Sequence, residues 1–467
     1  MKTSRLWKLL RSFNKKEVKE LKKFVASPFF NQREDVVKLY DELMDCIHLK
    51  KITPTKEDVF RYVYPKDAFD SAQIHLISSL LYKVIEQYMT YCELHENEVN
   101  AKIQLAAAYR KRKLEDHFER TLEETQTLHK KTKFKNAEFY DLSYQIMFEE
   151  FDFHRVTQRM EAYKLQEISG NMDTAFIAKK LRQSCGMLSH QAVMKKQYDF
   201  GLHDKIMEYL EAQESIKIPA VSAYYYCYKM LKAQKEEDFV HFKTIITENA
   251  SIFPDSEIKD LYLAAINFCI KRMNDENLEY VKNAFSLYQQ MLEKGILIEN
   301  NVISRFAYRN IVSTGVVLKE FDWVEKFIKN YTQNLETNYK ETMYSLSLGR
   351  LNYERGNLKE AMSLLQKADY TDLLLNLSAK TILMKIYYEL DEYDLLSSHL
   401  TAMKTFIKRH KNVLGYHSTN YSNIAHYTQK LNDMNKMDKN AVEKLVQDIN
   451  AETVLTERKW ILRMLGL

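Results

Sequence analysis

The chain has 467 residues, of which 45% are hydrophobic and 28% charged, and its formal net charge is +5. Nine glycines and five prolines are few for this length, which disfavours turn-rich β architectures and long flexible linkers, because both need residues that accept positive φ or fix a bend. We therefore expect an all-α protein of several domains or one elongated array, since so long a chain does not fit one compact core.

Neither membrane segments nor disulfides are indicated. Charged residues interrupt the first residues every few positions, and no run of about 18 apolar residues occurs, so we expect no signal peptide and no membrane span. The five cysteines are odd in number and widely spaced. This pattern is typical of reduced, structural thiols and indicates a cytoplasmic setting.

Residues 4–48 are predicted to form three helices. Asn14 precedes the second helix and is a good N-cap, because its side chain can accept a hydrogen bond from a free backbone N–H. Ser27-Pro28 ends that helix, since the residue before a proline is disfavoured in the α region. Asn31 is expected to cap the third helix.

Positive charge is concentrated in these first helices. Between residues 2 and 23, nine Lys or Arg side chains, Lys2 among them, stand against two Glu, which gives a local net charge of +7 and leaves −2 for the rest. One face of the second helix forms a basic patch of Lys15, Lys16, Lys19, Lys22 and Lys23. The patch is either a solvated face or a contact surface for nucleic acid, anionic lipid or an acidic partner.

The next predicted elements complete an N-terminal domain. Thr55 with Asp58 resembles a capping arrangement for a short helix over 56–64. The helical pattern then continues to Lys113, as one long helix or as two with a bend near Asn97. We assign residues 1–110 to a basic helical domain.

Residues 111–300 are predicted to continue as helical hairpins. Clusters of turn-forming residues mark the connections between helices. They fall at 133–136, 169–171, 199–201, 217–219 and 253–254.

Residues 342–403 contain two helical hairpins in succession. Each has a small or apolar residue early in its first helix, a turn former between the helices, and apolar residues along the second. In the first hairpin these are Gly349, Gly356-Asn357, Ala361, Leu365 and Ala368; in the second they are Met384, Asp391-Glu392, Leu396, Leu400 and Met403. Equivalent positions, such as Gly349 and Met384, are 35 residues apart.

This spacing resembles that of tetratricopeptide repeats, whose period is roughly 34 residues. A third, degenerate unit precedes the pair, so the resemblance covers residues 305–403. It implies a right-handed superhelical solenoid of helical hairpins over 111–431. Because a stack of hairpins must cover its last apolar face, residues 432–467, with helices expected at 441–449 and 453–465, are predicted to be a C-terminal helical cap.

The resemblance also implies a partner-binding groove, since the first helices of tetratricopeptide hairpins line the concave surface. The corresponding positions here include Met343, Arg350, Tyr353, Glu354, Lys385, Tyr388 and Glu389. Such a groove suits a peptide, with the rings supplying contact area and the charges fixing register. The alternative is that Arg350 with Glu354, and Lys385 with Glu389, are ordinary i,i+4 helix pairs.

Catalytic and metal-binding patterns are not found in the sequence. It has no Gly-rich phosphate loop, no Gly-x-Ser-x-Gly elbow and no Cys-x-x-Cys pair. Asp41, Asp45 and His48 share one helical face, but a single row without a second ligand-bearing helix favours a structural role. We therefore expect no enzyme activity, no cofactor and no metal.

Together these observations predict a cytoplasmic, non-catalytic interaction scaffold that binds a peptide or protein on the concave face of a tetratricopeptide-like array. The alternative is a helical-repeat protein that binds nucleic acid through the basic N-terminal helices and the clusters at 110–113 and 130–135. The sequence determines neither the partner nor the oligomeric state.

Overall fold

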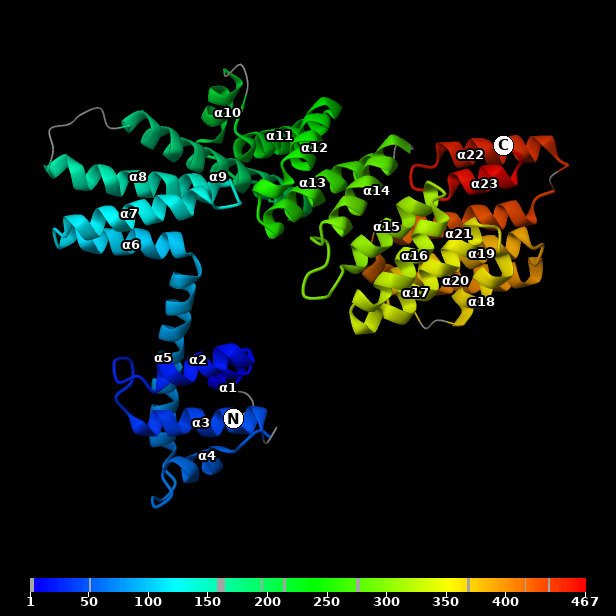
Figure 1. Cartoon of the computed structure of the whole chain (residues 1–467). Helices are drawn as coiled ribbons and strands as arrows, with labels where there is room; N and C mark the ends of the chain where they lie inside the picture. Colours follow the sequence, from blue (N-terminus) through cyan, green and yellow to red (C-terminus); the bar gives the residue numbers. More distant parts are fainter. Residues whose placement is uncertain are drawn as a thin grey trace. The chain divides into compact units, whose positions relative to one another are not determined.

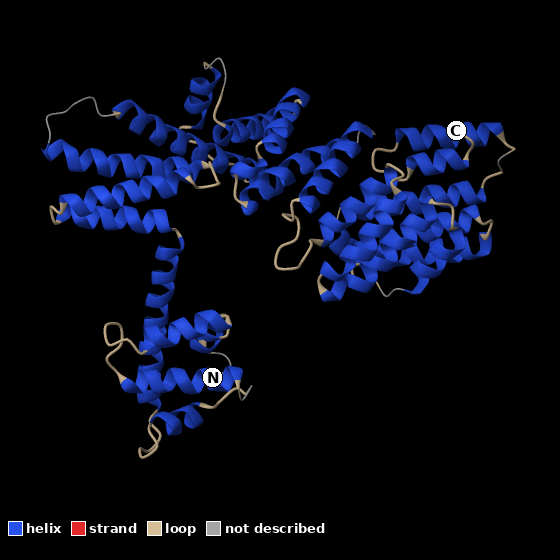
Figure 2. Cartoon of the chain, in the orientation of Figure 1, coloured by secondary structure: helices blue, strands red, loops and turns tan. Residues whose placement is uncertain are grey.

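The structure is a computed structural model of the whole chain. It describes residues 4–49, 52–157, 164–194, 196–212, 216–273, 278–367, 370–415, 417–435 and 437–467. Lys2 and Ala368, which the sequence analysis singled out, lie outside this set. Within the described residues there are 23 α-helices, three short 3-10 helices and no β-strand (Figure 2). The expectation of an all-α fold is confirmed.

The chain divides into two compact units, residues 1–180 and 181–467. Helix α9 contributes residues to both units. The first unit begins with α1 (Arg5–Leu10), α2 (Lys15–Val25), α3 (Glu34–His48), α4 (Lys56–Val63) and α5 (Ser71–Glu96) (Figure 1).

These five helices enclose one apolar core. Its side chains come from every one of them and include Leu10, Leu21, Leu43, Phe60 and Leu81, all almost completely removed from solvent. Burial of that many large apolar side chains is the dominant stabilising term for a domain of this size.

Two of the predicted caps are present. Asn14 accepts hydrogen bonds from the backbone of Lys16 and Glu17, while the Glu17 carboxylate accepts one from the N–H of Asn14. Thr55 and Asp58 form the same reciprocal arrangement at α4. Each pair satisfies backbone donors that the first helical turn leaves free.

The cap assigned to Asn31 is wrong. Helix α3 begins at Glu34, and its N-cap is Arg33, which makes no side-chain capping bond. The Asn31 side chain instead bonds the backbone of Val25 and Arg33 and so stabilises the turn before the helix. Asparagine stabilises turns and caps by the same hydrogen-bonding chemistry, so the sequence did not distinguish the two.

The bend near Asn97 is confirmed as a break between two helices, since Asn97 is extended and caps the second one. The unit continues with α6 (Glu98–Lys111), α7 (Glu115–Lys130), α8 (Ala137–Thr157) and the start of α9 (Leu165–Met194). A second apolar core joins α6, α7 and α8, where the rings of Phe118 and Phe153 stack at 4.1 Å.

The connection expected at 169–171 is wrong, because these residues lie inside α9. Gly170 and its neighbours are weak helix formers, each costing only a fraction of a kcal/mol to about 1 kcal/mol. The helix offsets part of this cost locally, since Asn171 donates to the carbonyl of Glu167 and Thr174 donates to that of Gly170.

The second unit is built almost entirely from short helices in pairs. Its helices after α9 are α10 (His203–Glu211), α11 (Pro219–Ala233), α12 (Glu236–Glu248), α13 (Asp255–Met273), α14 (Leu278–Glu293), α15 (Arg305–Val317), α16 (Phe321–Tyr331), α17 (Lys340–Glu354), α18 (Leu358–Lys367), α19 (Leu373–Glu389), α20 (Tyr393–Leu414), α21 (His417–Asp433), α22 (Lys439–Ala451) and α23 (Arg458–Met464). The 3-10 helices are η1 (Ala250–Ile252), η2 (Thr332–Asn334) and η3 (Thr337–Tyr339).

Each of the pairs α11–α12, α13–α14, α15–α16, α17–α18 and α19–α20 packs together. In addition, α15 contacts α17, α17 contacts α19, and α19 contacts α21. Of the two predicted C-terminal helices, α22 extends beyond the expected 441–449 at both ends, whereas α23 is shorter than the expected 453–465 and begins only at Arg458.

Buried tyrosines explain much of the aromatic content of this unit. Tyr262, Tyr288 and Tyr308 are almost fully buried, and each hydroxyl has a side-chain partner. A buried phenol needs such a partner, because an unpaired hydroxyl costs free energy away from water.

Two further properties concern the whole described chain. All five cysteines are free thiols, and only Cys92 is exposed. Of the helices in the described residues, none combines the length and the apolar character needed to cross a membrane.

Candidate functional site

The face formed by α17 and α19 carries most of the residues predicted to line a groove. Helix α17 can lie close to α18 because Gly349 has no side chain. A Cβ at this position would stand 2.7 Å from Cγ of Leu365. This close approach is the role expected for a small residue within a hairpin. The close approach at Gly349 sets the orientation of α17, so the opposite side of this helix faces away from α18.

Glu389 is the centre of the face. Its carboxylate accepts hydrogen bonds from the hydroxyl of Tyr353 on α17 at 2.6 Å and from the indole Nε1 of Trp460 on α23 at 2.7 Å. The guanidinium of Arg463, also on α23, donates to the same oxygen at 3.3 Å. Burial raises the pKa of Tyr353, and the Glu389 charge raises it further, so the phenol remains a donor.

Lys385 lies one turn before Glu389 and also contacts the C-terminal segment. Its ammonium forms an ion pair with Glu457 and lies over the rings of Tyr353 and Trp460, at 5.6 and 5.8 Å from their centroids. Tyr388 meets Trp460 edge to face, with ring centroids 5.6 Å apart. Lys385 and Glu389 therefore do not form the i,i+4 pair with each other that was the alternative.

The remaining predicted groove residues differ in exposure. Met343 is 1% exposed, so its side chain packs inside and presents no surface. Arg350 is half-buried and Glu354 exposed, and both line a hollow of about 130 Å³ together with Lys385 and Glu457. Within the described residues, Arg350 forms neither an ion pair nor a side-chain hydrogen bond.

Helix α21 holds the C-terminal segment from another side. Asn420 exchanges two hydrogen bonds with Thr456, and the Asn423 amide donates to the carbonyl of Val454. Farther along, Lys430 forms an ion pair with Asp448. Figure 1 shows α23 between α22 and α21.

Sequence reasoning missed the residues that occupy the face. Trp460 was interpreted only as part of an apolar helical stripe, and Glu457 and Arg463 were not singled out. The available signal was their spacing of three, which places an acid, an indole and a base along one side of a helix.

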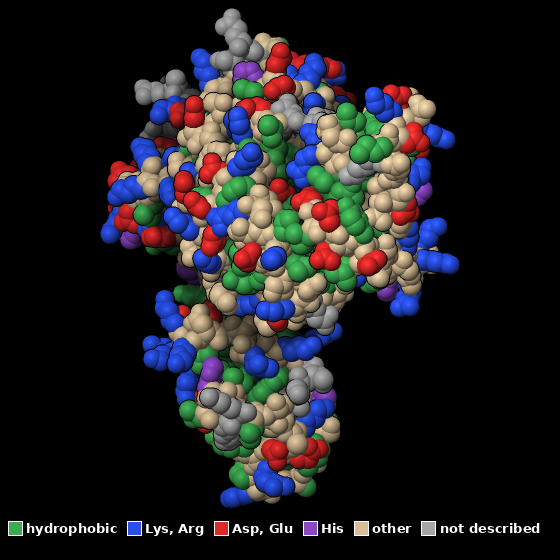
Figure 3. All heavy atoms as spheres, turned by 90° about the vertical axis from the view of Figure 1, so that its right-hand side faces the viewer, with side chains coloured by type: hydrophobic (Ala, Val, Ile, Leu, Met, Phe, Trp, Pro, Cys, Tyr) green, Lys and Arg blue, Asp and Glu red, His purple; other side chains and the backbone are tan. Residues whose placement is uncertain are grey.

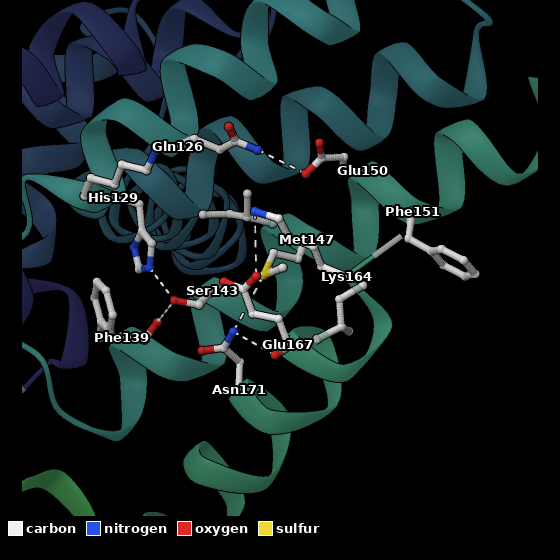
Figure 4. A pocket seen from close by; sticks show the side chains of 13 residues that line it. Gln126, His129, Phe139, Ser143, Met147, Glu150, Phe151, Lys164, Glu167 and Asn171 are labelled. Atoms are coloured by element: carbon white, nitrogen blue, oxygen red, sulfur yellow. Dashed lines mark hydrogen bonds and ion pairs between the residues drawn. The ribbon is translucent and has the colours of Figure 1, made fainter. Parts of the chain in front are cut away.

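A second hollow, of about 550 Å³, lies in the first unit between α7, α8 and the start of α9 (Figure 4). Gln126 points across it toward Glu150, with a hydrogen bond of 3.1 Å. His129 lies on its wall, stacked on Phe139 at 4.2 Å, with Nε2 at 2.7 Å from the Ser143 hydroxyl.

The pairing of His129 with Ser143 does not have the geometry of an activated nucleophile. Such a histidine is oriented by a third group at its other nitrogen, yet Nδ1 of His129 has no hydrogen-bond partner among the described residues. The Ser143 hydroxyl also contacts the carbonyl of Phe139 at 2.9 Å. Burial lowers the pKa of His129 to about 4, so the ring is neutral at pH 7.

The basic patch on α2 is solvent-exposed at all five of its lysines. Lys22 forms an ion pair with Asp41 at 3.0 Å. Figure 3 shows Lys and Arg side chains gathered over the upper part of the body that contains the first helices.

The other basic clusters are partly engaged within the chain. Arg110 forms ion pairs with Glu149 at 2.8 Å and with Asp152 at 3.2 Å, and the Lys135 ammonium lies 3.7 Å from the centroid of the Phe139 ring. A cation already paired in this way has less to offer a phosphate group.

No group of three or more His, Cys, Asp or Glu side chains in the described part of the chain is arranged to hold a metal ion. Comparison with known proteins gave no match to a family model, to a curated protein or to a solved structure.

Proposed function

We propose that this chain is a non-catalytic interaction protein that binds a helical segment of a partner on the face of α17 and α19. We further propose that its helical hairpins form a tetratricopeptide-like solenoid, preceded by a basic helical domain at 1–110 and closed by a cap at 432–467. Five free thiols fit the cytoplasmic setting that the sequence indicates.

The repeat interpretation is supported by the packing of the second unit. Successive helices pack in pairs, and the first helices of neighbouring pairs, α15, α17 and α19, contact each other in turn. Gly349 provides the close approach within one pair. Stacked hairpins of this kind create extended binding surfaces.

The single observation that carries the binding proposal is that the face already holds a helix. Three of the predicted groove residues, Lys385, Tyr388 and Glu389, contact Glu457, Trp460 or Arg463 of the C-terminal segment, and a fourth, Tyr353, donates a hydrogen bond to Glu389. A helix in a groove is a recurring mode of peptide recognition, with anchors at spacings of three and four residues. Here the anchor is a buried Trp, the residue type most enriched at binding hot spots.

Site-specific crosslinking tests this proposal. A photo-reactive side chain is placed at Glu354, which is exposed on α17 beside the face, and in a control protein at Glu360, which is exposed on α18. In cell lysate we expect protein adducts from position 354, unchanged by nuclease and by about 200 mM salt, and none from position 360.

The same experiment separates the nucleic-acid alternative. Phosphate contacts weaken steeply between about 50 and 200 mM salt. Adducts that disappear with nuclease or with salt, or that form equally at both positions, would contradict binding at the α17–α19 face.

A further inference from the structure

The C-terminal segment grips the α17–α19 face through a row of side chains three residues apart. Glu457 meets Lys385, Trp460 meets Tyr388 and Glu389, and Arg463 meets Glu389. Residues three apart lie on one side of a helix, so acid, indole and base form a single stripe. The stripe reads Glu-x-x-Trp-x-x-Arg in the sequence.

The contact between the C-terminal segment and the α17–α19 face is polar. A cap that only covered the apolar end of a helical stack would not need such polar contacts. On the face itself, a lysine, a glutamate and a tyrosine hydroxyl interact with the segment or with each other. If the segment left, these groups would be hydrated rather than stranded, because water replaces such hydrogen bonds at little net cost. The face would therefore survive without its cover.

Apart from a part-buried hydrogen bond from the Tyr427 hydroxyl to the carbonyl of Asp448, the other polar attachments of the segment are also readily exchanged for water. The Lys430–Asp448 ion pair is exposed on both sides, and the bonds of Asn420 and Asn423 are exposed as well. Surface ion pairs contribute little to stability. What holds the segment is a small apolar set: Leu445, Ile449, Leu455, Trp460 and Ile461.

Arg350 indicates what a competing ligand would add. It borders the hollow of about 130 Å³ whose lining also includes Thr456 and Glu457, and within the described residues nothing pairs with it. The segment presents Thr456 and Glu457 at this hollow, and the Glu457 carboxylate is already paired with Lys385. A ligand with a carboxylate there would gain an ion pair that the chain's own segment lacks.

We propose that residues 437–467 are a displaceable internal ligand of the α17–α19 face. The natural partner is then a helical segment of another protein with the same acid, aromatic and base stripe and one further carboxylate directed at Arg350. This inference rests on the proposed function, and it adds the chemistry of the partner and the regulation of the face.

Because the segment is tethered to the face, it can occupy the face even when its own contacts contribute little binding free energy. A segment joined by a short linker competes at an effective concentration in the millimolar range. The partner must therefore bind through better contacts, which the Arg350 pair supplies, or the segment must be weakened first.

A labelled peptide of residues 437–467 tests this inference against the full-length chain by fluorescence anisotropy. We expect the peptide to bind the full-length Trp460→Ala variant at least about tenfold more tightly than the wild-type chain, whose own segment competes for the face. A peptide that itself carries Trp460→Ala is the control and should bind neither protein.

The role of Arg350 is tested with a peptide that carries Thr456→Glu. We expect it to bind the Trp460→Ala chain about five- to tenfold more tightly than the native peptide, as one added charge-assisted contact provides. The gain should vanish when the chain also carries Arg350→Ala. A gain that persists in that variant would overturn the assignment of Arg350.

A second variant covers the case in which Trp460→Ala disturbs folding. The full-length Lys385→Glu chain should bind a Glu457→Lys peptide in preference to the native peptide, because the ion pair is restored with its charges exchanged. A folded chain that binds no peptide in either variant, or a native peptide that binds wild type and Trp460→Ala equally, would overturn the internal-ligand inference. Adducts at position 354 would still stand in that case, so the two proposals fail separately.

Discussion

The first five helices and the C-terminal segment are held in place by different kinds of contact. Helices α1–α5 share a core of apolar side chains, in which Leu39, Leu43 and Phe60 are almost completely buried. Helices α22 and α23 are held by only a small set of buried apolar side chains, and their remaining contacts are hydrogen bonds and ion pairs. An apolar core is lost only when the domain unfolds, whereas polar contacts can be exchanged for those of a partner.

The largest effect is expected in the apolar core. Phe60 is 1% exposed, and Phe60→Ala should lower the free energy of unfolding of the N-terminal helices by roughly 3–5 kcal/mol, the usual cost of a large cavity. Chemical denaturation followed by circular dichroism measures it.

Phe29 provides the matched control in the same region. It is 86% exposed in the turn between α2 and α3, so Phe29→Ala should change stability by less than about 0.5 kcal/mol. Equal losses of unfolding free energy in the two variants would contradict the assignment of the apolar core as the main source of stability for these helices.

The region of α6–α8 adds a pH-dependent contribution to stability, because its packing includes the buried His129. The pKa of His129 is lowered to about 4 from an ordinary 6.5, so the unfolded chain binds more protons between these values. Stability is then fully present above pH 6.5 and is lost as the pH falls toward 4, by about 2 kcal/mol at pH 5.

The variant His129→Gln isolates this contribution, since glutamine keeps a polar group near Ser143 and does not titrate. Urea midpoints of the wild type and the variant, measured at pH 7.5 and pH 5, should show a smaller loss in the variant. Parallel losses would assign the pH dependence to other groups, such as His399, whose pKa burial also lowers.

A smaller effect is expected beneath the binding face. Gly349→Ala places a Cβ within 2.7 Å of Leu365 and should destabilise the second unit by roughly 1–3 kcal/mol. Gly186→Ala in α9 meets nothing within 4 Å and should stabilise the helix by about 0.5–1 kcal/mol. Thermal melts of both variants check the opposite signs, and two changes of the same sign would contradict the close approach of α17 and α18.

The smallest effect is expected on the basic patch. Reversing Lys15, Lys19 and Lys22 to Glu should change the unfolding free energy by less than about 1 kcal/mol, since all three are exposed and only Lys22 forms an ion pair there. Calorimetry of the triple variant measures it. An unfolded product would refute the assignment of a solvated face.

Local features were well predicted from the sequence, because their causes lie within a few residues. Asn14 and Thr55 cap helices through groups two or three positions away, and Asn97 ends one helix and begins another. The break predicted at 169–171 is absent. A weak helix propensity over three residues does not decide the state of a 30-residue helix, which depends on contacts along its whole length.

The binding face could be predicted only in part. A repeat period places Tyr353, Lys385 and Glu389 at equivalent positions, but it does not reveal what covers them. That depends on Trp460, which reaches Glu389 across 71 residues of sequence. The spacing of Glu457, Trp460 and Arg463 does not by itself identify the distant segment that they contact, so this stripe becomes meaningful only beside its receptor.

Native-state hydrogen exchange tests the central claim most directly. We predict that the backbone amides of α22 and α23 exchange through an opening that costs at least about 2 kcal/mol less than the unfolding of α17 and α19, because the polar contacts of the segment can break while the face stays folded. Protection that is equal in the two regions, with the same dependence on denaturant, would contradict a separately displaceable segment.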